Sequence, residues 1–374
     1  MDFAYGDDQQ ALIDLAAKIF REKAGHARLR ELERGAGPRF DRELWRALAE
    51  AGLLGTALPE AHGGAGLGFL EVSAVLEQAG RAAAPVPLFE TLVLGALPIA
   101  RFAPPGLALR WLPGVASGEV VLSAGLVEAN AEPRAPQTAA KRSGRGWRLH
   151  GEKHCVPAAE LAARILVPAR AAGGEIVLLL VDPSSKGVRL TPLATTSGRA
   201  ESHLALDGVL VGPDEVVIGP EGGSEALEWL LEHATAAQAA MAVGLCAAAL
   251  ELTADYVKTR KQFDQPIAMF QAVAHRAADA YIDVEAIRLT ALQACWRLSE
   301  GLPAAAEVAL AKFWAAEAGQ RVVAAAQHLH GGVGVDREYP LHRYTLQAKE
   351  LELQLGGATA QLLRIGELLA AQAS

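Results

Sequence analysis

The sequence predicts a multidomain α+β protein in which a small β domain stands between two helical ones. Three patterns along the chain carry this prediction. Residues 1–118 read as amphipathic helices, residues 119–224 as short strands between turn residues, and residues 225–374 as an almost continuous helical pattern. We therefore expect an N-terminal helical domain, a β-barrel-like middle domain and a C-terminal four-helix bundle.

The N-terminal segment carries its own helix signals. Apolar residues recur at helical spacing near its start: Ala11, Leu12, Leu15, Ala16 and Phe20. Asp41 is a candidate N-cap for a helix over 42–51, with Gly52 as its stop signal. Another helix is predicted over 69–81. The glycine-rich loop 58–68 lacks the spacing of a dinucleotide-binding or P-loop motif, which argues against a phosphate site.

The middle segment shows short runs of β-branched and aliphatic residues. Turn residues, such as those at 144–146 and 207–208, separate the runs. Apolar and polar residues alternate over 202–206, as in a half-buried sheet. The predicted strands cover 120–127, 147–150, 165–168, 176–181, 188–192 and 203–206.

The C-terminal segment is predicted to be helical from Glu225 to Gln372. Breaks are expected near Asp264, Gly301 and Gly331. The chain is 51% hydrophobic, which is enough to bury a large core.

One break in this segment combines a cation with aromatic residues. The helical pattern over 236–259 stops before Arg260, Asp264 breaks it, and a new helix is predicted from near Phe270. This spacing places Arg260 and Phe263 at a helix C-terminal corner. Together they could hold a phosphate and a flat ring at once.

Composition and charge exclude several classes of function. A net charge of −8 argues against a nucleic-acid partner. The cysteines, Cys155, Cys246 and Cys295, form neither a disulfide framework nor a CxxC site, so a reducing cytoplasm fits them best. No apolar run reaches the ~18 residues of a membrane span, and residues 1–10 lack the plan of a signal peptide. We expect a soluble, cytoplasmic protein that does not bind membranes.

The run from Arg260 to Gln271, with His275, Asp279 and Tyr281 behind it, resembles the acyl-CoA dehydrogenase family. The order of helical, β and helical segments resembles that family over nearly the whole chain. The resemblance implies an FAD-dependent enzyme that removes a proton from the α-carbon of an acyl-CoA thioester and passes a hydride from its β-carbon to the flavin. In this family each flavin lies between two subunits. One subunit holds the isoalloxazine and the base, and its neighbour holds the adenine end.

The half of the site that this chain would lend to a neighbour is mostly present. The resemblance assigns contacts with the pyrophosphate and adenine of FAD to Arg260, Phe263, Ile267, Phe270 and Gln271. The segment 327–334 resembles the family's Gln-x-x-Gly-Gly-x-Gly turn, which adds Gly331 and Gly332; His328 stands where the family usually has Gln. His328 and His330 are two residues apart on a helix end, so they point apart, and we expect no metal site.

The half that this chain would keep for its own flavin looks different. The loop 127–134 corresponds to the family's Thr-Glu-Pro-Gly-x-Gly-Ser-Asp loop, but the first hydroxyl and the glycines are gone. After a Gly-x-Lys-x turn at 151–154, Cys155-Val156-Pro157 replaces the family's Trp-Ile-Thr. Pro157 has neither an N–H nor a hydroxyl to donate to a flavin. We interpret Cys155 as a small apolar filler.

The catalytic base departs most from the family. Counting from the pair 348–349 places the usual glutamate at Leu355, or at Gly356 after a one-residue slip. The position that a minority of the family uses falls at Ala234, followed by Thr235 in place of a frequent Arg. None of these side chains can accept the proton.

Two carboxylates, Glu232 and Glu352, lie near these positions and are weak candidates for a displaced base; we interpret both as solvated helix-face charges. One half of the family's flavin site is mostly kept in this sequence, whereas the other half is mostly replaced. This asymmetry predicts the base-lacking, FAD-capping subunit of a mixed α2β2 acyl-CoA dehydrogenase. FAD would then be held at an interface with a partner subunit, and this chain alone need not be active. By resemblance, such assemblies act on bulky CoA esters such as steroid side chains, and an electron-transfer flavoprotein accepts the electrons.

Two alternatives stay open at this point. An autonomous homotetramer would use Glu232 or Glu352 as its base and would hold flavin without a partner. A flavin-free acyl-CoA binding or scaffold protein would hold none. The presence of Arg260 and Phe263 counts against the second alternative, since nothing else obvious would use them.

Overall fold

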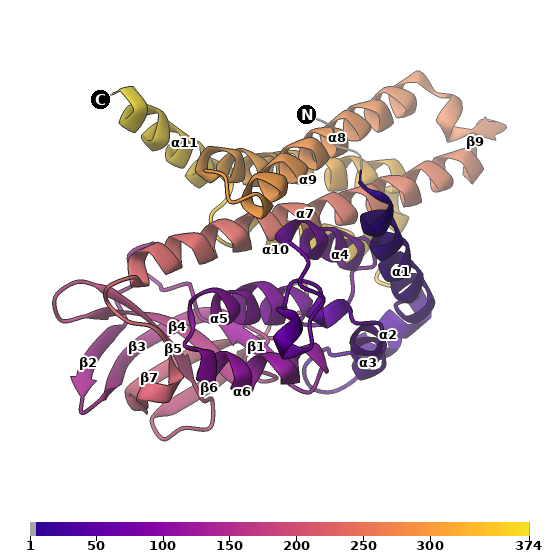
Figure 1. The fold of residues 1–374 in the computed structure, drawn as a ribbon. Helices are drawn as coiled ribbons and strands as arrows, with labels where there is room; N and C mark the ends of the chain where they lie inside the picture. Colours follow the sequence, from indigo (N-terminus) through magenta and orange to yellow (C-terminus); the bar gives the residue numbers. More distant parts are fainter. Residues whose placement is uncertain (1–4, 374) are drawn as a thin grey trace. The chain divides into compact units, whose positions relative to one another are not determined.

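The computed structural model describes residues 5–373, and it divides into two compact units (Figure 1). The bundle unit contains the chain up to residue 31, residues 69–84, and the chain from residue 235 on. The sheet unit contains residues 32–68 and 85–234. Along the sequence the order is helices, then strands, then helices, as predicted. The domain boundaries at 118 and 224 stay a prediction.

The sheet unit is built on eight strands. They are β1 (Leu122–Ala124), β2 (Ala139–Ser143), β3 (Gly146–Pro157), β4 (Arg164–Ala171), β5 (Ile176–Val181), β6 (Val188–Leu193), β7 (Glu201–Val211) and β8 (Val216–Ile218). The pairing order is β6-β7-β3-β2-β4-β5-β8, with β1 added beside β4. The pairs of β4 with β1 and with β2 are parallel, and the others are antiparallel. Its core contains the buried side chains of Trp147, Leu149, Ile165, Val177 and Leu204.

Strand prediction was accurate for the aliphatic runs and failed for the polar ones. Each predicted run overlaps a strand, and β5 matches its prediction residue for residue. The structure also contains β2 and the short β8, which were not predicted. β2 was missed because its exposed Lys141 and Arg142 are not typical strand residues. The turn expected at 151–154 is wrong, because β3 continues to Pro157 and pairs with β7 on both sides of an irregularity between Lys153 and Val156. Hydrogen bonding across the sheet overrides the local turn signal of one glycine.

Helices precede the strands in the sheet unit. These are α3 (Arg42–Glu50), a π-helical turn (Glu90–Ala96), α5 (Leu97–Phe102) and α6 (Pro105–Ala116), while α2 (His26–Arg34) crosses from one unit into the other. Asp41 caps α3 as predicted: its side chain accepts hydrogen bonds from the backbone N–H groups of Glu43 (3.1 Å) and Leu44 (3.2 Å). In the loop 58–68, a Cβ on Gly64 would lie 2.1 Å from the Leu58 carbonyl oxygen, so the loop folds onto itself as a structural corner.

The bundle unit consists of long helices. They are α1 (Asp7–Lys23), α4 (Phe69–Arg81), α7 (Gly223–Thr259), α8 (Gln271–Ser299), α9 (Ala305–His330), α10 (Leu341–Leu353) and α11 (Ala358–Ala373). The part of α7 before residue 235 belongs to the sheet unit. α9 packs against α8, α10 and α11. The breaks near 264, 301 and 331 are confirmed, and a further break over 354–357 gives five C-terminal helices instead of four.

Small residues let the bundle helices approach closely. A Cβ on Gly80 of α4 would lie 2.2 Å from the Met241 carbonyl oxygen of α7. Conversely, a Cβ on Gly244 of α7 would lie 1.8 Å from the Glu77 carbonyl oxygen of α4. The backbones of α4 and α7 therefore touch at this crossing. In α1 the buried stripe is narrower than predicted, because Ala11 and Leu15 are exposed.

Helix α7 is long and apolar enough to cross a membrane by length and composition alone, although polar residues such as Thr235 and Gln238 interrupt its apolar run. However, 78% of its most apolar window is buried inside the protein. Its alanine-rich surface is occupied by neighbouring residues, as in the core helix of a globular domain.

Candidate functional site

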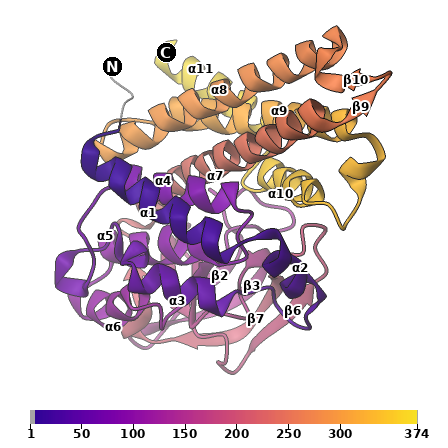
Figure 2. The same cartoon turned by 90° about the vertical axis from the view of Figure 1, so that its right-hand side faces the viewer.

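The segment after α7 forms a small hairpin that the sequence did not predict. β9 (Lys261–Gln262) pairs with β10 (Gln265–Pro266), and the two strands project beyond the ends of α7 and α8 (Figure 2). The tip residues, Phe263 and Asp264, both have positive φ angles of 54° and 65°. Two-residue hairpins of this type require that conformation, but a bulky residue rarely adopts it. Phe263 is therefore held in a strained position at the tip.

The hairpin presents a cation and an aromatic ring to solvent. Phe263 is 87% exposed, and its ring meets that of Phe270 edge to face, with centroids 6.0 Å apart. Arg260 is exposed and has no ion pair within the part of the chain that the structure describes. The Arg260 carbonyl accepts a hydrogen bond from Ile267 N–H at 2.8 Å, which closes the base of the hairpin. Gln271 begins α8, and its side chain is exposed.

A second element of the bundle unit lies next to this hairpin along the helix ends. α9 ends at His330, which is 3% exposed, and Gly331 follows with φ 62° and ψ −140°. This region of backbone angles is open essentially to glycine alone. Beyond the adjoining residues, no atom of the described chain lies within 4 Å of a Cβ placed on Gly331 or Gly332, so both glycines face open space. His328 is exposed, two residues before the buried His330, as predicted.

Aromatic contacts tie the hairpin to the glycine turn. The ring of Tyr256, four residues before Arg260, stacks on His330, with centroids 4.3 Å apart. The Tyr256 hydroxyl donates to the His330 carbonyl at 3.4 Å, and Nε2 of His330 pairs with the Tyr339 hydroxyl at 3.1 Å. Burial lowers the pKa of His330, so its ring is a neutral packing element. The structure thus brings the two predicted segments to one end of the bundle.

In the sheet unit, residues of the segments that the sequence comparison assigned to the isoalloxazine end make contacts within the chain. Lys153 of β3 is 0% exposed, and its Nζ donates to Glu128 Oε1 (2.6 Å) and to the Pro168 carbonyl (2.8 Å). The Glu128 carboxylate also accepts from Thr138 Oγ1 (2.7 Å) and from the N–H of Gln137. Burial alone would raise the pKa of Glu128, but Lys153 and these donors hold it below its usual value. Glu128 is a structural carboxylate that supports the sheet.

The end of β3 has an irregular backbone. The register with β7 shifts between Lys153 and Val156, and Cys155 has a φ angle of 48°. Cys155 is exposed, so its interpretation as an apolar filler is wrong: it is the extra residue of a β-bulge. Pro157 offers no N–H, and its carbonyl already accepts a short hydrogen bond from the Ser123 hydroxyl.

The position that the sequence count assigns to the family's base lies just after α10. α10 ends at Leu353, and Leu355 and Gly356 follow with φ angles of 56° and 93°. Their carbonyls both accept hydrogen bonds from Gln361 Nε2 at 3.1 Å. Glu352 forms an ion pair with Lys349 one turn earlier on α10, but its side chain is only 23% exposed, so the interpretation of Glu352 as a solvated charge is wrong.

The alternative base position is also apolar. Ala234 is 0% exposed and Thr235 is 7% exposed within α7. Glu232, two residues earlier, is half-buried and has a polar partner of its own. Glu232 belongs to the sheet unit and Glu352 to the bundle unit.

A buried polar network near the end of α10 was missed by sequence reasoning. Lys312 of α9 is 0% exposed, and its Nζ donates to Gln238 Oε1 (3.0 Å) and to the Leu351 carbonyl. Gln238 Nε2 donates in turn to Gln354 Oε1 at 3.0 Å. Burial lowers the pKa of Lys312 to about 7, against the opposing effect of Glu352. The only sequence signal was a single lysine within the alanine-rich run of α9.

Comparison with known families covers most of the chain. The acyl-CoA dehydrogenase N-terminal domain matches residues 6–119, the middle domain matches residues 128–209, and the C-terminal domain matches residues 221–369. The three matches follow one another in the order of helical, β and helical segments that the structure shows.

Individual relatives extend over nearly the same length. Acyl-CoA dehydrogenase FadE27 of Mycobacterium tuberculosis is 43% identical, with 99% of each chain aligned. A chain in the crystal structure of the ChsE4-ChsE5 complex from Mycobacterium tuberculosis superposes with a TM-score of 0.94 at 43% identity, covering 99% of both chains. A chain in the structure of a variant of the Tcur3481-Tcur3483 steroid ACAD gives 0.92 at 43% identity, covering 98% of this chain and 99% of that one. On these matches, the chain belongs to the acyl-CoA dehydrogenase family, the FAD-dependent oxidoreductases of acyl-CoA thioesters.

Proposed function

We propose that this chain is the base-lacking, FAD-capping subunit of a heteromeric acyl-CoA dehydrogenase. The observation that carries the proposal is the contrast between the two halves of the family's flavin site. Arg260, Phe263 and the Gly331 turn are exposed and make few contacts with the rest of the described chain. Leu355 and Gly356, at the usual base position, can take no proton.

The bundle unit fits the adenine end of FAD. Arg260 can donate charge-assisted hydrogen bonds to a pyrophosphate, and the ring of Phe263 offers an apolar face to a flat ring. The open space beside Gly331 and Gly332 lets a ligand approach the backbone of this turn closely. We assign Ile267, Phe270, Gln271 and His328 to the same surface, with roles as its supporting and polar contacts.

The sheet unit does not fit the isoalloxazine end. The position that donates to the flavin edge in the family is Pro157, which has no hydrogen to donate. Glu128 is held by Lys153 and cannot turn toward a ligand without leaving a buried ammonium unpaired. When bound, FAD supplies the redox chemistry; this chain would position its adenine half and leave the α-proton to a carboxylate of the partner subunit.

The class of substrate follows from the relatives. Two similar structures are described as a complex and as a steroid ACAD, which supports a heteromer acting on a steroid CoA ester. We infer that the reaction is α,β-dehydrogenation of the acyl chain, that an electron-transfer flavoprotein accepts the electrons, and that the assembly is a dimer of dimers. The free cysteines favour the cytoplasm as its location.

The test is the ratio of flavin to protein, measured by the visible spectrum after denaturation. The chain purified alone should be colourless. Co-purified with a glutamate-bearing family member, it should hold about one flavin for each pair of chains, because each complete site needs one half from each subunit. A ratio near one for the chain alone, with bleaching by acyl-CoA, would favour the autonomous homotetramer. No flavin even with a partner would favour the scaffold protein.

A further inference from the structure

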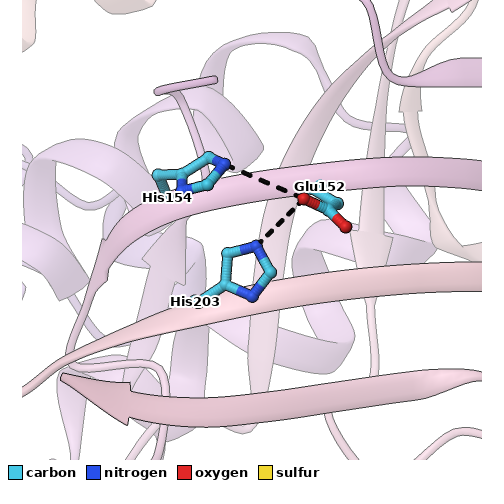
Figure 3. Close-up of side chains that lie close together, drawn as sticks. All are labelled: Glu152, His154 and His203. Atoms are coloured by element: carbon cyan, nitrogen blue, oxygen red, sulfur yellow. Dashed lines mark hydrogen bonds and ion pairs between the residues drawn. The ribbon is translucent and has the colours of Figure 1, made fainter. Parts of the chain in front are cut away.

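A group of metal-ligating side chains lies on the sheet unit and takes no part in the flavin site proposed above. Glu152 and His154 are two residues apart on β3, so they share one face of the strand. His203 comes from the neighbouring strand β7 and turns toward the same carboxylate (Figure 3). Lys153, between the two β3 ligands, is fully buried on the opposite face.

The distances match a shared cation better than a single ion pair. Oε2 of Glu152 lies 3.3 Å from His203 Nε2 and 3.9 Å from His154 Nε2. One ligand atom from each residue lies within 4.8 Å of the other two. A tetrahedral Zn²⁺ bound at about 2.0–2.2 Å holds its ligand atoms roughly 3.4 Å apart, so small rotations of the exposed Glu152 and the half-buried imidazole rings complete the site.

The backbone beneath the three side chains is fixed. The His154 N–H donates to the Val127 carbonyl at 2.8 Å, and Lys153 is anchored to Glu128 at 2.6 Å. β7 pairs with β3 up to Lys153 and again from Val156. Three ligands on two paired strands are therefore pre-positioned, which reduces the entropy lost when a cation binds.

We propose that Glu152, His154 and His203 bind a divalent transition-metal ion of the zinc class. Two imidazoles and one carboxylate are the ligands that Zn²⁺ takes, whereas Mg²⁺ and Ca²⁺ prefer oxygen alone. The side chains of Glu152, His154 and His203 are 59%, 36% and 22% exposed, so solvent reaches the fourth position. The expectation of no metal site rested on His328 and His330 and did not consider this strand pair.

The experiment uses Zn²⁺ as the probe and the full-length chain, stripped with EDTA and freed of any histidine tag. Calorimetric titration should give one saturable site per chain. His154→Gln and His203→Gln should each weaken Zn²⁺ binding by about tenfold or more, and Glu152→Gln should weaken it too. A Cu²⁺ electron paramagnetic resonance spectrum should show nitrogen coupling that both histidine variants reduce.

His150→Gln is the matched control. His150 is on the same strand and 46% exposed, but its Nδ1 lies 3.6 Å from Asp207 and accepts from the Gly208 N–H, so its loss should leave Zn²⁺ affinity unchanged. Circular dichroism establishes that each variant is folded. The proposal is overturned if Zn²⁺ does not saturate a site below about 1 mM, if the His154 and His203 variants bind as the parent does, or if His150→Gln weakens binding equally. None of these outcomes depends on flavin or on a partner subunit.

Discussion

The hairpin at the end of α7 and the end of strand β3 use their polar groups in opposite ways. At the hairpin, Arg260 and Phe263 are exposed and make few contacts with their own chain. At β3, Lys153, Glu128 and the Pro157 carbonyl are all paired within the sheet unit. A group that the chain has already satisfied costs free energy to recruit, whereas an exposed one is available to a ligand. The difference indicates which half of a shared site this chain can supply.

The largest expected effect concerns the base. In the complex with a glutamate-bearing partner, replacing that partner's base by Gln should lower turnover on the order of 10²- to 10⁴-fold. The double variant Glu232→Gln/Glu352→Gln in this chain should change turnover by less than about twofold, since the proposal assigns the base to the partner subunit and neither half-buried carboxylate a catalytic role. A large loss of turnover from the double variant, with the partner intact, would show that this chain carries its own base. It would contradict the inference that this chain supplies only the adenine half of the site.

Flavin retention should depend on the hairpin cation. Arg260→Gln should weaken FAD binding to the complex by about 1.5–3 kcal/mol, or roughly ten- to a hundredfold in Kd, because charge-assisted hydrogen bonds to the pyrophosphate are lost. Arg276→Gln, another exposed arginine on the neighbouring helix α8, is the control and should retain flavin. The readout is flavin released on dilution, followed by fluorescence. Equal losses from the two variants would contradict a specific role for Arg260.

The glycine turn gives a paired test of backbone and ligand effects. Gly331→Ala should lower the free energy of unfolding by about 1–3 kcal/mol, because its backbone angles are unfavourable for any other residue. Gly332 does not have a positive φ angle, so Gly332→Ala should leave the free energy of unfolding close to that of the parent. Both should weaken FAD binding in the complex, since each adds a methyl group in open space beside the backbone. Chemical denaturation and flavin release separate the two effects.

A further comparison concerns two cations of the bundle unit, the exposed Arg260 and the buried Lys312. The pKa of Lys312 is about 7 in the folded protein against 10.5 ordinarily, so above pH 7 unfolding takes up a proton. Its contribution makes the free energy of unfolding rise with pH between about 7 and 10.5, by up to about 1.4 kcal/mol per pH unit.

The measurement is the difference in unfolding free energy between the parent and Lys312→Met at several pH values. The difference should grow with pH in that window. A flat difference for Lys312→Met would mean that the ammonium stays charged in the folded protein.

Sequence reasoning was strongest where local signals and tertiary structure agree. The cap at Asp41, the helix over 69–81 and strand β5 were predicted to within a residue or two, because periodicity and end signals coincide there. It failed at the hairpin, because Phe263 is a poor residue for a turn with positive φ. It also missed the Lys312 network and the Glu152, His154 and His203 cluster, whose partners are distant in sequence.

The roles of individual site residues could be proposed from sequence but not tested by it. Gly331 and Phe263 occupy conformations that a pattern of letters does not reveal. Cys155 was misjudged because burial depends on a bulge in β3, and a bulge is fixed by pairing with β7. Exposure and hydrogen-bond partners, which decide availability to a ligand, are properties of the folded chain alone.

The exposed aromatic tip has a consequence for how cells make this protein. Phe263 is 87% exposed, and Met269, Ile282 and Tyr281 nearby are 70%, 64% and 59% exposed. Chains with such apolar surface are captured by chaperones, degraded or aggregated until another surface covers them. If this chain forms the proposed heteromer, an unassembled excess of it would therefore be short-lived, and its steady-state level would follow the supply of the partner.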